Sequence, residues 1–284
     1  MEPLGFEDAR RWVNAALAED VGSGDVTTTA MIPPEAVASA RMVARQELVV
    51  CGLSLAEAAF RELDPAAFVE RAAEDGQRVA RGALLLRVRG SARALLTAER
   101  VALNFVQRLS GIATLTARYV AAVNGSKAQI LDTRKTTPCW RRLEKYAVRC
   151  GGGRNHRFGL FDQVLIKDNH LAALRGAAPD PVTAAVERAR RLAPGLTIEV
   201  EADTLDQAAL AAAAGADVIL LDNMSPAQLS AAVNLVAGRA RTEASGGITL
   251  ETAPAIAATG VDFLSVGALT HSAASVDIGL DFDE

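Results

Sequence analysis

The chain has 284 residues, of which 50% are hydrophobic and 23% are charged, a composition typical of globular proteins. Its formal net charge of −4 excludes a general attraction to nucleic acid or to anionic membranes, so any basic function has to be local. This length accommodates two small domains, or one barrel with an appended domain.

The sequence shows no sign of a signal peptide, a membrane span or stabilising disulfide bonds. Its three cysteines are odd in number and lack CxxC spacing, which favours neither a disulfide framework nor a zinc site. The first stretch, "MEPLGFEDARRWVNAALAEDVG", carries acidic residues and does not resemble a signal peptide. Apolar runs of about 18 residues, the length of a membrane span, do not occur. We therefore expect a cytoplasmic protein with no nucleic-acid or membrane partner.

Residues 1–110 are predicted to form a mixed α+β domain. Apolar runs that read as strands alternate with stretches of helical periodicity, in which apolar residues recur at three- and four-residue steps. The predicted strands lie within 38–52 and 82–90, and the predicted helices are 6–20, 53–63 and 96–125.

Residues 111–284 are predicted to form an incomplete α/β barrel related to the (β/α)8 type. Short apolar strands that end in polar residues are each followed by a helix, which is typical of buried parallel strands. A doubly wound open sheet is the alternative, although no GxGxxG follows the first strand. The predicted strands are 128–133, 163–168, 196–202, 216–222, 241–247 and 261–267, and the helices are 181–193, 205–214, 225–238 and 249–259.

Positive charge is concentrated in one part of this second domain. All four lysines lie between residues 127 and 167, although the other 26 of the 30 basic residues (30 − 4) are arginines. Because a lysine in an arginine-biased chain can be required as lysine, Lys135 and Lys167 are candidates for function. Within the helical stretch 141–150, Arg142, Lys145 and Arg149 have the spacing of a solvated helix face, and we expect them to coat one.

Five residues of the cationic cluster are predicted to bind a ligand. They lie at strand ends or after the triple glycine at 151–153, where the backbone can approach a ligand closely. Arginine side chains bind carboxylates through two parallel hydrogen bonds. The five residues are Arg134, Lys135, His156, Arg157 and Lys167.

Acidic residues occupy the ends of two neighbouring strands. Glu201 and Asp222 follow apolar runs, and their carboxylates are suited to hold Mg²⁺ or to accept hydrogen bonds from ribose hydroxyls. A salt bridge to the nearby cations is the simpler explanation, and the two are compatible. Glu199 precedes Glu201 by two positions. One of these two side chains is expected to face the barrel interior and the other the helices.

Glycine-rich turns follow the last two predicted strands. Backbone N–H groups in such turns bind phosphate, and in barrels this site often lies after the last two strands. The turns are Ser245, Gly246 and Gly247, and Val266, Gly267 and Ala268.

Taken together, the motifs resemble those of the quinolinate phosphoribosyltransferase family, the decarboxylating enzymes of de novo NAD synthesis. They are "DTRKTTP", "LEKYAV", "GGGRNHR", "VLIKDNH", "EVEAD", "LLDNM", "ASGGI" and "VGALTH". The resemblance extends over nearly the whole chain, from "ALAEDVGSGDVTT" to "THSAASVDIGLD". It implies a homodimer in which the N-terminal domain covers the barrel mouth of the partner, and it leaves open assembly into hexamers. The implied reaction converts quinolinate and phosphoribosyl pyrophosphate (PRPP), with Mg²⁺, into nicotinate mononucleotide, pyrophosphate and CO₂.

The resemblance also implies roles for individual residues. Quinolinate would be held by Arg134, His156, Arg157 and Lys167, with Arg100 arriving from the other subunit. Thr133 and Lys135 would support the binding of quinolinate or contact PRPP. The ribose hydroxyls and Mg²⁺ would be held by Glu201 and Asp222, which count with Lys135 and Lys167 as the catalytic residues. PRPP phosphate would be held by the two glycine turns and His271.

One position departs from the family pattern, because Cys139 stands where glycine usually follows the proline of the motif. We expect strain in this turn alone. The sequence alone leaves three alternative functions open. They are that of the molybdenum-transport-associated paralogue of the family, that of a Schiff-base aldolase with Lys167 as nucleophile, and that of a barrel that only binds anions.

Overall fold

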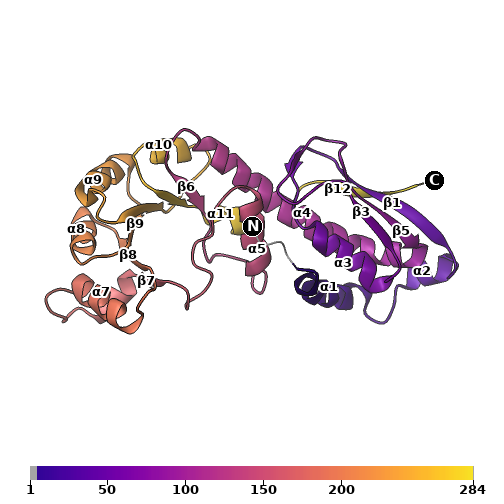
Figure 1. The fold of residues 1–284 in the computed structure, drawn as a ribbon, viewed down its shortest axis with the longest axis horizontal. Helices are drawn as coiled ribbons and strands as arrows, with labels where there is room; N and C mark the ends of the chain where they lie inside the picture. Colours follow the sequence, from indigo (N-terminus) through magenta and orange to yellow (C-terminus); the bar gives the residue numbers. More distant parts are fainter. Residues whose placement is uncertain (1–4, 284) are drawn as a thin grey trace. The chain divides into compact units, whose positions relative to one another are not determined.

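The computed structural model describes residues 5–283, which form two compact units that interleave along the chain (Figure 1). Unit 1 takes its described residues from 5–117, 142–152 and 272–283, and unit 2 from 118–141 and 153–271. The predicted boundary near residue 110 falls inside the long helix α4 (Ala92–Ala122), so it divides a continuous element. That boundary therefore stays a prediction.

Unit 1 is a mixed α+β unit built on a four-stranded antiparallel sheet in the order β12-β1-β5-β3. In β5, Leu86 and Val88 are buried whereas Arg87 and Arg89 are exposed, which is the alternation of a sheet with one covered face. The strands are β1 (Val37–Ala44), β3 (Phe68–Arg71), β5 (Leu84–Ser91) and β12 (Ile278–Phe282), with the separate pair β2 (Leu48–Val49) and β4 (Arg78–Val79). The helices are α1 (Phe6–Val21), α2 (Val26–Met31) and α3 (Leu53–Leu63), followed by α4 and α5 (Arg141–Cys150).

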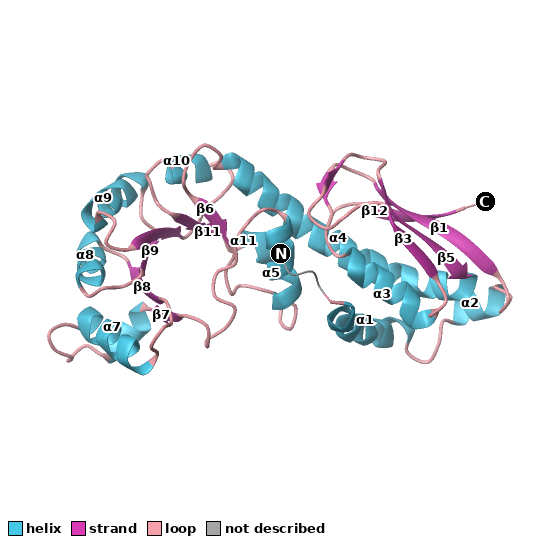
Figure 2. Ribbon diagram, viewed as in Figure 1, coloured by secondary structure: helices cyan, strands magenta, loops and turns pink. Residues whose placement is uncertain are grey.

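Unit 2 contains a six-stranded parallel sheet in the order β6-β11-β10-β9-β8-β7. Figure 2 shows the curved, barrel-like sheet with α7 to α10 along its outer side. A single parallel bridge from Leu131 to Arg154 extends the sheet beyond β6, and this incomplete barrel confirms the prediction. The strands are β6 (Gln129–Leu131), β7 (Val164–Ile166), β8 (Ile198–Ala202), β9 (Val218–Asp222), β10 (Arg241–Ser245) and β11 (Phe263–Ser265). The helices are α6 (Asp168–Ala173), α7 (Pro181–Leu192), α8 (Leu205–Ala213), α9 (Pro226–Val236), α10 (Ala253–Ala257) and α11 (Ala268–His271).

Side-chain caps set the starting points of the helices around this sheet. Asp180, Thr204 and Ser225 each accept a hydrogen bond from a backbone N–H of the first turn of α7, α8 and α9. Such caps satisfy backbone donors that a helix start leaves unpaired. Because α8 and α9 begin within a few residues of strands β8 and β9, the residues at those strand ends have little freedom.

Helix α4 is the longest helix, with 31 residues, and it is amphipathic. Neither α4 nor another helix within residues 5–283 is both long and apolar enough to cross a membrane.

The expectation that the charges of α5 coat a solvated face is wrong for Lys145. Arg142 and Arg149 are exposed, but Lys145 is only 3% exposed. The adjacent Glu144 is 0% exposed, and its Oε1 lies 3.2 Å from Nη2 of Arg108. Helical spacing predicts which residues share a face, but it does not predict that a face rich in charge packs against another helix.

Candidate active site

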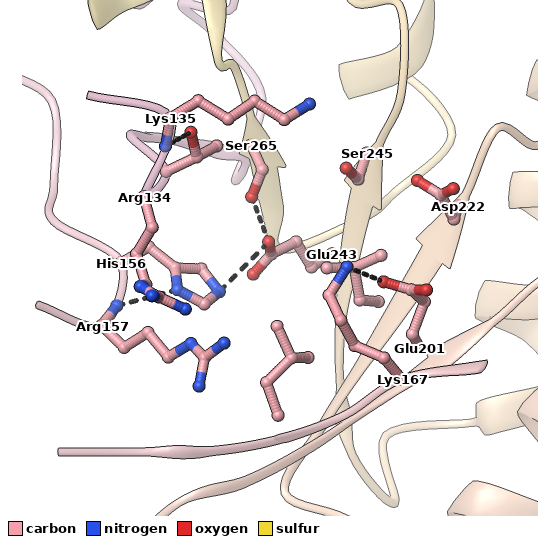
Figure 3. Close-up of a pocket in the computed structure, with 13 residues that line it drawn as sticks. Arg134, Lys135, His156, Arg157, Lys167, Glu201, Asp222, Glu243, Ser245 and Ser265 are labelled. Atoms are coloured by element: carbon pink, nitrogen blue, oxygen red, sulfur yellow. Dashed lines mark hydrogen bonds and ion pairs between the residues drawn. The ribbon is translucent and has the colours of Figure 1, made fainter. Parts of the chain in front are cut away.

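A pocket of about 440 Å³ lies at the carboxyl ends of the parallel strands of unit 2 (Figure 3). Catalytic sites of barrel folds lie at this end, because loops from several strands meet there. Nine of the predicted residues line the pocket, namely Thr133, Arg134, Lys135, His156, Arg157, Lys167, Glu201, Asp222 and Ser245. Leu165, Leu220, Glu243 and Ser265 complete the lining.

The loop that carries His156 is fixed by a buried carboxylate at the end of β6. Asp132 is 0% exposed, and it accepts hydrogen bonds from Nδ2 of Asn155 at 2.6 Å and from the backbone N–H of His156 at 2.9 Å. Hydrogen bonds to a charged acceptor are stronger than those between neutral groups. The loop after the triple glycine is therefore held to the strand that also leads into Arg134.

Arg134 and Arg157 bring like charges together in a partly buried place. Burial, followed by the charge of Arg134, lowers the pKa of the Arg157 guanidinium, while the charge of Glu199 opposes this. Nε of Arg134 is buried and has no hydrogen-bond partner among the described residues. Because buried donors are rarely left unpaired, this atom is a candidate contact for the acceptor of a ligand. The pair is therefore suited to an anion.

Lys167 lies directly after β7 and pairs with Glu201 at the end of β8. Its Nζ is 2.9 Å from Oε2 of Glu201, and the two side chains are 47% and 12% exposed. The ammonium thus remains open to a ligand on its solvent side. The predicted salt bridge between the acidic and basic clusters is confirmed for this pair.

Asp222, at the end of β9, is held by its neighbour in the chain. Nδ2 of Asn223 donates to Oδ2 of Asp222 at 2.6 Å, and Asn223 has a left-handed backbone with φ of 54°. Gly246 allows this arrangement, since a Cβ there would lie 2.1 Å from Oδ1 of Asn223. Glycine at position 246 is thus explained by its close packing against Asn223, the neighbour of Asp222.

The expectation that Glu199 and Glu201 face opposite sides of the sheet is wrong. Side chains along a strand alternate with a period of two, so residues two positions apart share a face. Both point to the pocket side, where Glu201 contacts Lys167 and Glu199 lies deeper, with Oε2 2.9 Å from Nε2 of His156.

Two polar residues of the pocket lining were not predicted from the sequence. Glu243 on β10 is 2% exposed, with Oε1 at 3.6 Å from Nε2 of His156, and it accepts a hydrogen bond from Oγ of Ser265 on β11. Burial, and then the charge of Glu199, raise the pKa of Glu243 to about 8. The available signal was a glutamate in the middle of the strand "RTEAS", because an ionisable residue inside a buried strand is rare unless it has a partner.

The remaining predicted residues do not line this pocket. Six of them lie in unit 2 in the turns after β10 and β11 or in α11, namely Gly246, Gly247, Val266, Gly267, Ala268 and His271. Gly267 lies close to two predicted phosphate ligands, because a Cβ there would be 3.1 Å from both Nε2 of His271 and Cδ of Lys135. Arg100 belongs to α4 in unit 1, where it is exposed and lines a separate hollow of about 320 Å³. The phosphate site and the role of Arg100 stay predictions.

Two family models together match most of the chain. The model of the quinolinate phosphoribosyl transferase N-terminal domain matches residues 25–110, and that of the C-terminal domain matches residues 112–281.

Individual relatives are similar over nearly their whole length. A nicotinate-nucleotide pyrophosphorylase [carboxylating] of Mycobacterium leprae is 48% identical over 283 residues, which cover 97% of this chain and 98% of the relative. A probable enzyme of the same name from Bacillus subtilis is 43% identical over 273 residues, or 96% and 92% of the two chains. The structure of the nicotinate-nucleotide pyrophosphorylase from Francisella tularensis has a TM-score of 0.92 at 39% identity, covering 99% of this chain and 98% of that one.

The raised pKa of Glu243 predicts how stability changes with pH. Below the ordinary glutamate value of 4.5, folded and unfolded chains both hold the proton. Between 4.5 and about 8 only the folded chain keeps it, so this contribution to stability decreases as pH rises and is lost above about 8. Glu243→Gln cannot ionise, and from pH 5 to pH 9 its Tm should fall by roughly several degrees less than that of the wild type. Parallel Tm curves for the two proteins would contradict the burial of an ionisable Glu243.

Proposed function

The chain belongs to the quinolinate phosphoribosyl transferase family, and on that premise we propose that it transfers the phosphoribosyl group of PRPP to quinolinate, with loss of CO₂. The products are nicotinate mononucleotide and pyrophosphate, and the reaction belongs to de novo NAD synthesis. One observation carries this proposal: several cations and two carboxylates converge in a single pocket at the strand ends of unit 2.

Quinolinate is a dicarboxylate, and one side of the pocket offers the donors that it needs. Figure 3 shows the side chains of Arg134, His156 and Arg157 gathered on one side, with Lys167 reaching into the pocket from β7. The buried, unpaired Nε of Arg134 supports a carboxylate acceptor at this place. Charge-assisted hydrogen bonds are strongest where water is excluded, so the two carboxylates would each be matched by fixed cations.

The other side of the pocket suits PRPP and Mg²⁺. Glu201, Asp222 and Ser245 lie there, and the ammonium group of Lys135 extends to the same side (Figure 3). The donor set fits Mg²⁺, which prefers carboxylate oxygens and is often held by one or two of them together with substrate phosphates. One oxygen of Glu201 and one of Asp222 make no hydrogen bond to the described residues. When bound, Mg²⁺ would supply charge neutralisation of the pyrophosphate.

The chemistry that we propose is mainly electrostatic. As pyrophosphate leaves, positive charge develops at C1 of the ribose, and the carboxylates of Glu201 and Asp222 stabilise it. Lys135 neutralises charge on the departing group. After the new C–N bond forms, the carboxylate on the adjacent ring carbon leaves as CO₂. The electron pair of the broken C–C bond stays on that carbon, stabilised by the neighbouring pyridinium charge, and the carbon then takes up a proton from water. This route needs no protein nucleophile, so the pairing of Lys167 with Glu201 suits binding better than Schiff-base formation.

We also propose that the protein acts as a homodimer with shared sites. Arg100 is exposed in unit 1 and forms no hydrogen bond or ion pair with the other described residues. An exposed helix arginine contributes well under ~1 kcal/mol to stability, so a large effect of its removal on activity would need another cause. In the shared site, Arg100 binds a carboxylate of quinolinate in the partner subunit.

The first prediction concerns the choice of substrate. Incubation with PRPP, Mg²⁺ and quinolinate should yield nicotinate mononucleotide and CO₂, both of which are measurable by chromatography and isotope release. Nicotinic acid, with one carboxylate, leaves a buried cation unpaired, at a cost of roughly 1.5–3 kcal/mol or more. It should therefore be a poor substrate. Comparable turnover of nicotinic acid and quinolinate would refute the proposed specificity.

The second prediction separates the two halves of the pocket. Asp222→Asn keeps the size of the side chain but removes its charge, so it should impair the use of PRPP and weaken the dependence on Mg²⁺. Quinolinate binding should largely survive, because Arg134 and Arg157 lie on the other side of the pocket (Figure 3). Calorimetry with each ligand alone measures this. Equal loss of both ligands would indicate a collapsed pocket instead.

The third prediction tests the shared site. Arg100→Ala should lower activity by at least about a hundredfold, equivalent to roughly 2.7 kcal/mol, with little change in Tm. Lys167→Ala should also be nearly inactive. When the two variants exchange subunits, each heterodimer has one pocket with both lesions and one with neither, so up to about half of the wild-type activity should return. Inactive heterodimers, with wild-type protein surviving the same exchange, would show that the site is not shared.

A further inference from the structure

A buried polar cluster lies directly beneath the side of the pocket assigned to quinolinate. Nε2 of His156 is 2.9 Å from Oε2 of Glu199 and 3.6 Å from Oε1 of Glu243. The three side chains are 9%, 0% and 2% exposed, so solvent does not share these contacts. The proposed reaction uses His156 but assigns nothing to the two glutamates.

The imidazole of His156 is held at both ring nitrogens. Nδ1 accepts a hydrogen bond from the backbone N–H of Arg157 at 2.8 Å, so in this arrangement Nδ1 carries no proton. The ring proton is then on Nε2, which faces the two carboxyl groups. The same ring thus connects the buried glutamates to the backbone of Arg157, whose guanidinium lines the pocket.

The two glutamates complete each other's hydrogen bonding. Oε2 of Glu199 also accepts from Nε2 of Gln163 at 2.6 Å, but Oε1 is buried and has no partner among the described residues. Glu243 is its neighbour, and with the pKa of Glu243 at about 8 that carboxyl group keeps a proton at neutral pH. A neutral carboxyl group has an O–H to donate, and the unpaired Oε1 of Glu199 is the acceptor that lacks a donor. Ser265 fixes Glu243 from β11.

We propose that Glu199 and Glu243 are positioning residues for quinolinate. They hold the imidazole of His156, and through it the backbone of Arg157, in the arrangement that receives the substrate's carboxylates. The inference rests on the proposed function. Its physical basis is that a displacement of about 1 Å in a binding group is enough to cost a large factor in rate or affinity.

The test compares the Michaelis constants of the two substrates in single variants of Glu243 and its neighbours. Glu243→Ala should raise the KM for quinolinate by at least about tenfold, because His156 loses one of its two carboxyl partners. The KM for PRPP should stay within about twofold, since its ligands lie across the pocket. Glu243→Gln should return the quinolinate KM to within about threefold of the wild type, because its amide accepts from Ser265 and donates toward Glu199.

Thr242→Val is the matched control on the same strand. Thr242 is 2% exposed and adjacent to Glu243, but its hydroxyl donates to Asp262, away from the pocket. This variant should lose stability without a change in either KM. Ser265→Ala removes the donor to Glu243 and is the milder variant to use if Glu243→Ala does not fold. Its quinolinate KM should rise by roughly twofold to fivefold.

A double-mutant cycle tests whether Glu243 acts through His156. In a His156→Ala background, Glu243→Ala should raise the quinolinate KM no further, because the ring that it positions is gone. Additive effects would overturn the proposal, and so would equal increases in both Michaelis constants. A third outcome would also overturn the proposal: Glu243→Gln is as damaging as Glu243→Ala, and added zinc restores its activity. That result would indicate a metal site instead, since the ligand atoms of His156, Glu199 and Glu243 lie close enough to hold one ion. Failure of the proposed function has a different signature, because the wild-type protein itself would then not turn over quinolinate.

Discussion

The structure depends on holding like charges together in a pocket sheltered from water. Burial, and then the charge of Arg134, lower the pKa of the Arg157 guanidinium. The charge of Glu199 on β8 opposes this effect, and on the same face of β8 Glu201 pairs with Lys167. No carboxylate or other acceptor among residues 5–283 pairs with Nε of Arg134. That residual deficit of acceptors supports the proposal that the pocket binds an anionic ligand.

The fold supplies the rigidity that this arrangement needs. Parallel strands place their carboxyl ends at one edge, and buried hydrogen bonds then fix the loops that leave them. Asp132 ties the loop of His156 to β6, and Asn223 ties Asp222 to the turn at Gly246. Cys139 has a φ of 65°, a conformation that favours glycine, so the strain expected in that turn is present but lies away from the pocket.

The sequence predicts this pocket well where local patterns decide the outcome. Apolar runs that end in polar residues predicted the strands of unit 2, and the residues after them are the pocket lining. It fails where distant parts of the chain meet. Strand β12 pairs with β1 across more than two hundred residues, and no local pattern specifies that partner. Lys145 has the helical spacing of a surface charge in the sequence, yet its side chain is buried in the structure.

The positive and negative side chains lie on different sides of the pocket. This arrangement matches the places where opposite charges occur in the proposed reaction. On the side assigned to quinolinate, the buried Glu199 holds the imidazole of His156, and Asp132 holds the loop that carries it. Glu201 and Asp222 lie on the opposite side (Figure 3), where positive charge develops on the ribose. Because preorganised groups do not have to reorient during the reaction, each can stabilise the charge that appears beside it. The buried glutamates beneath His156 are therefore as much a part of this arrangement as the cations that line the pocket.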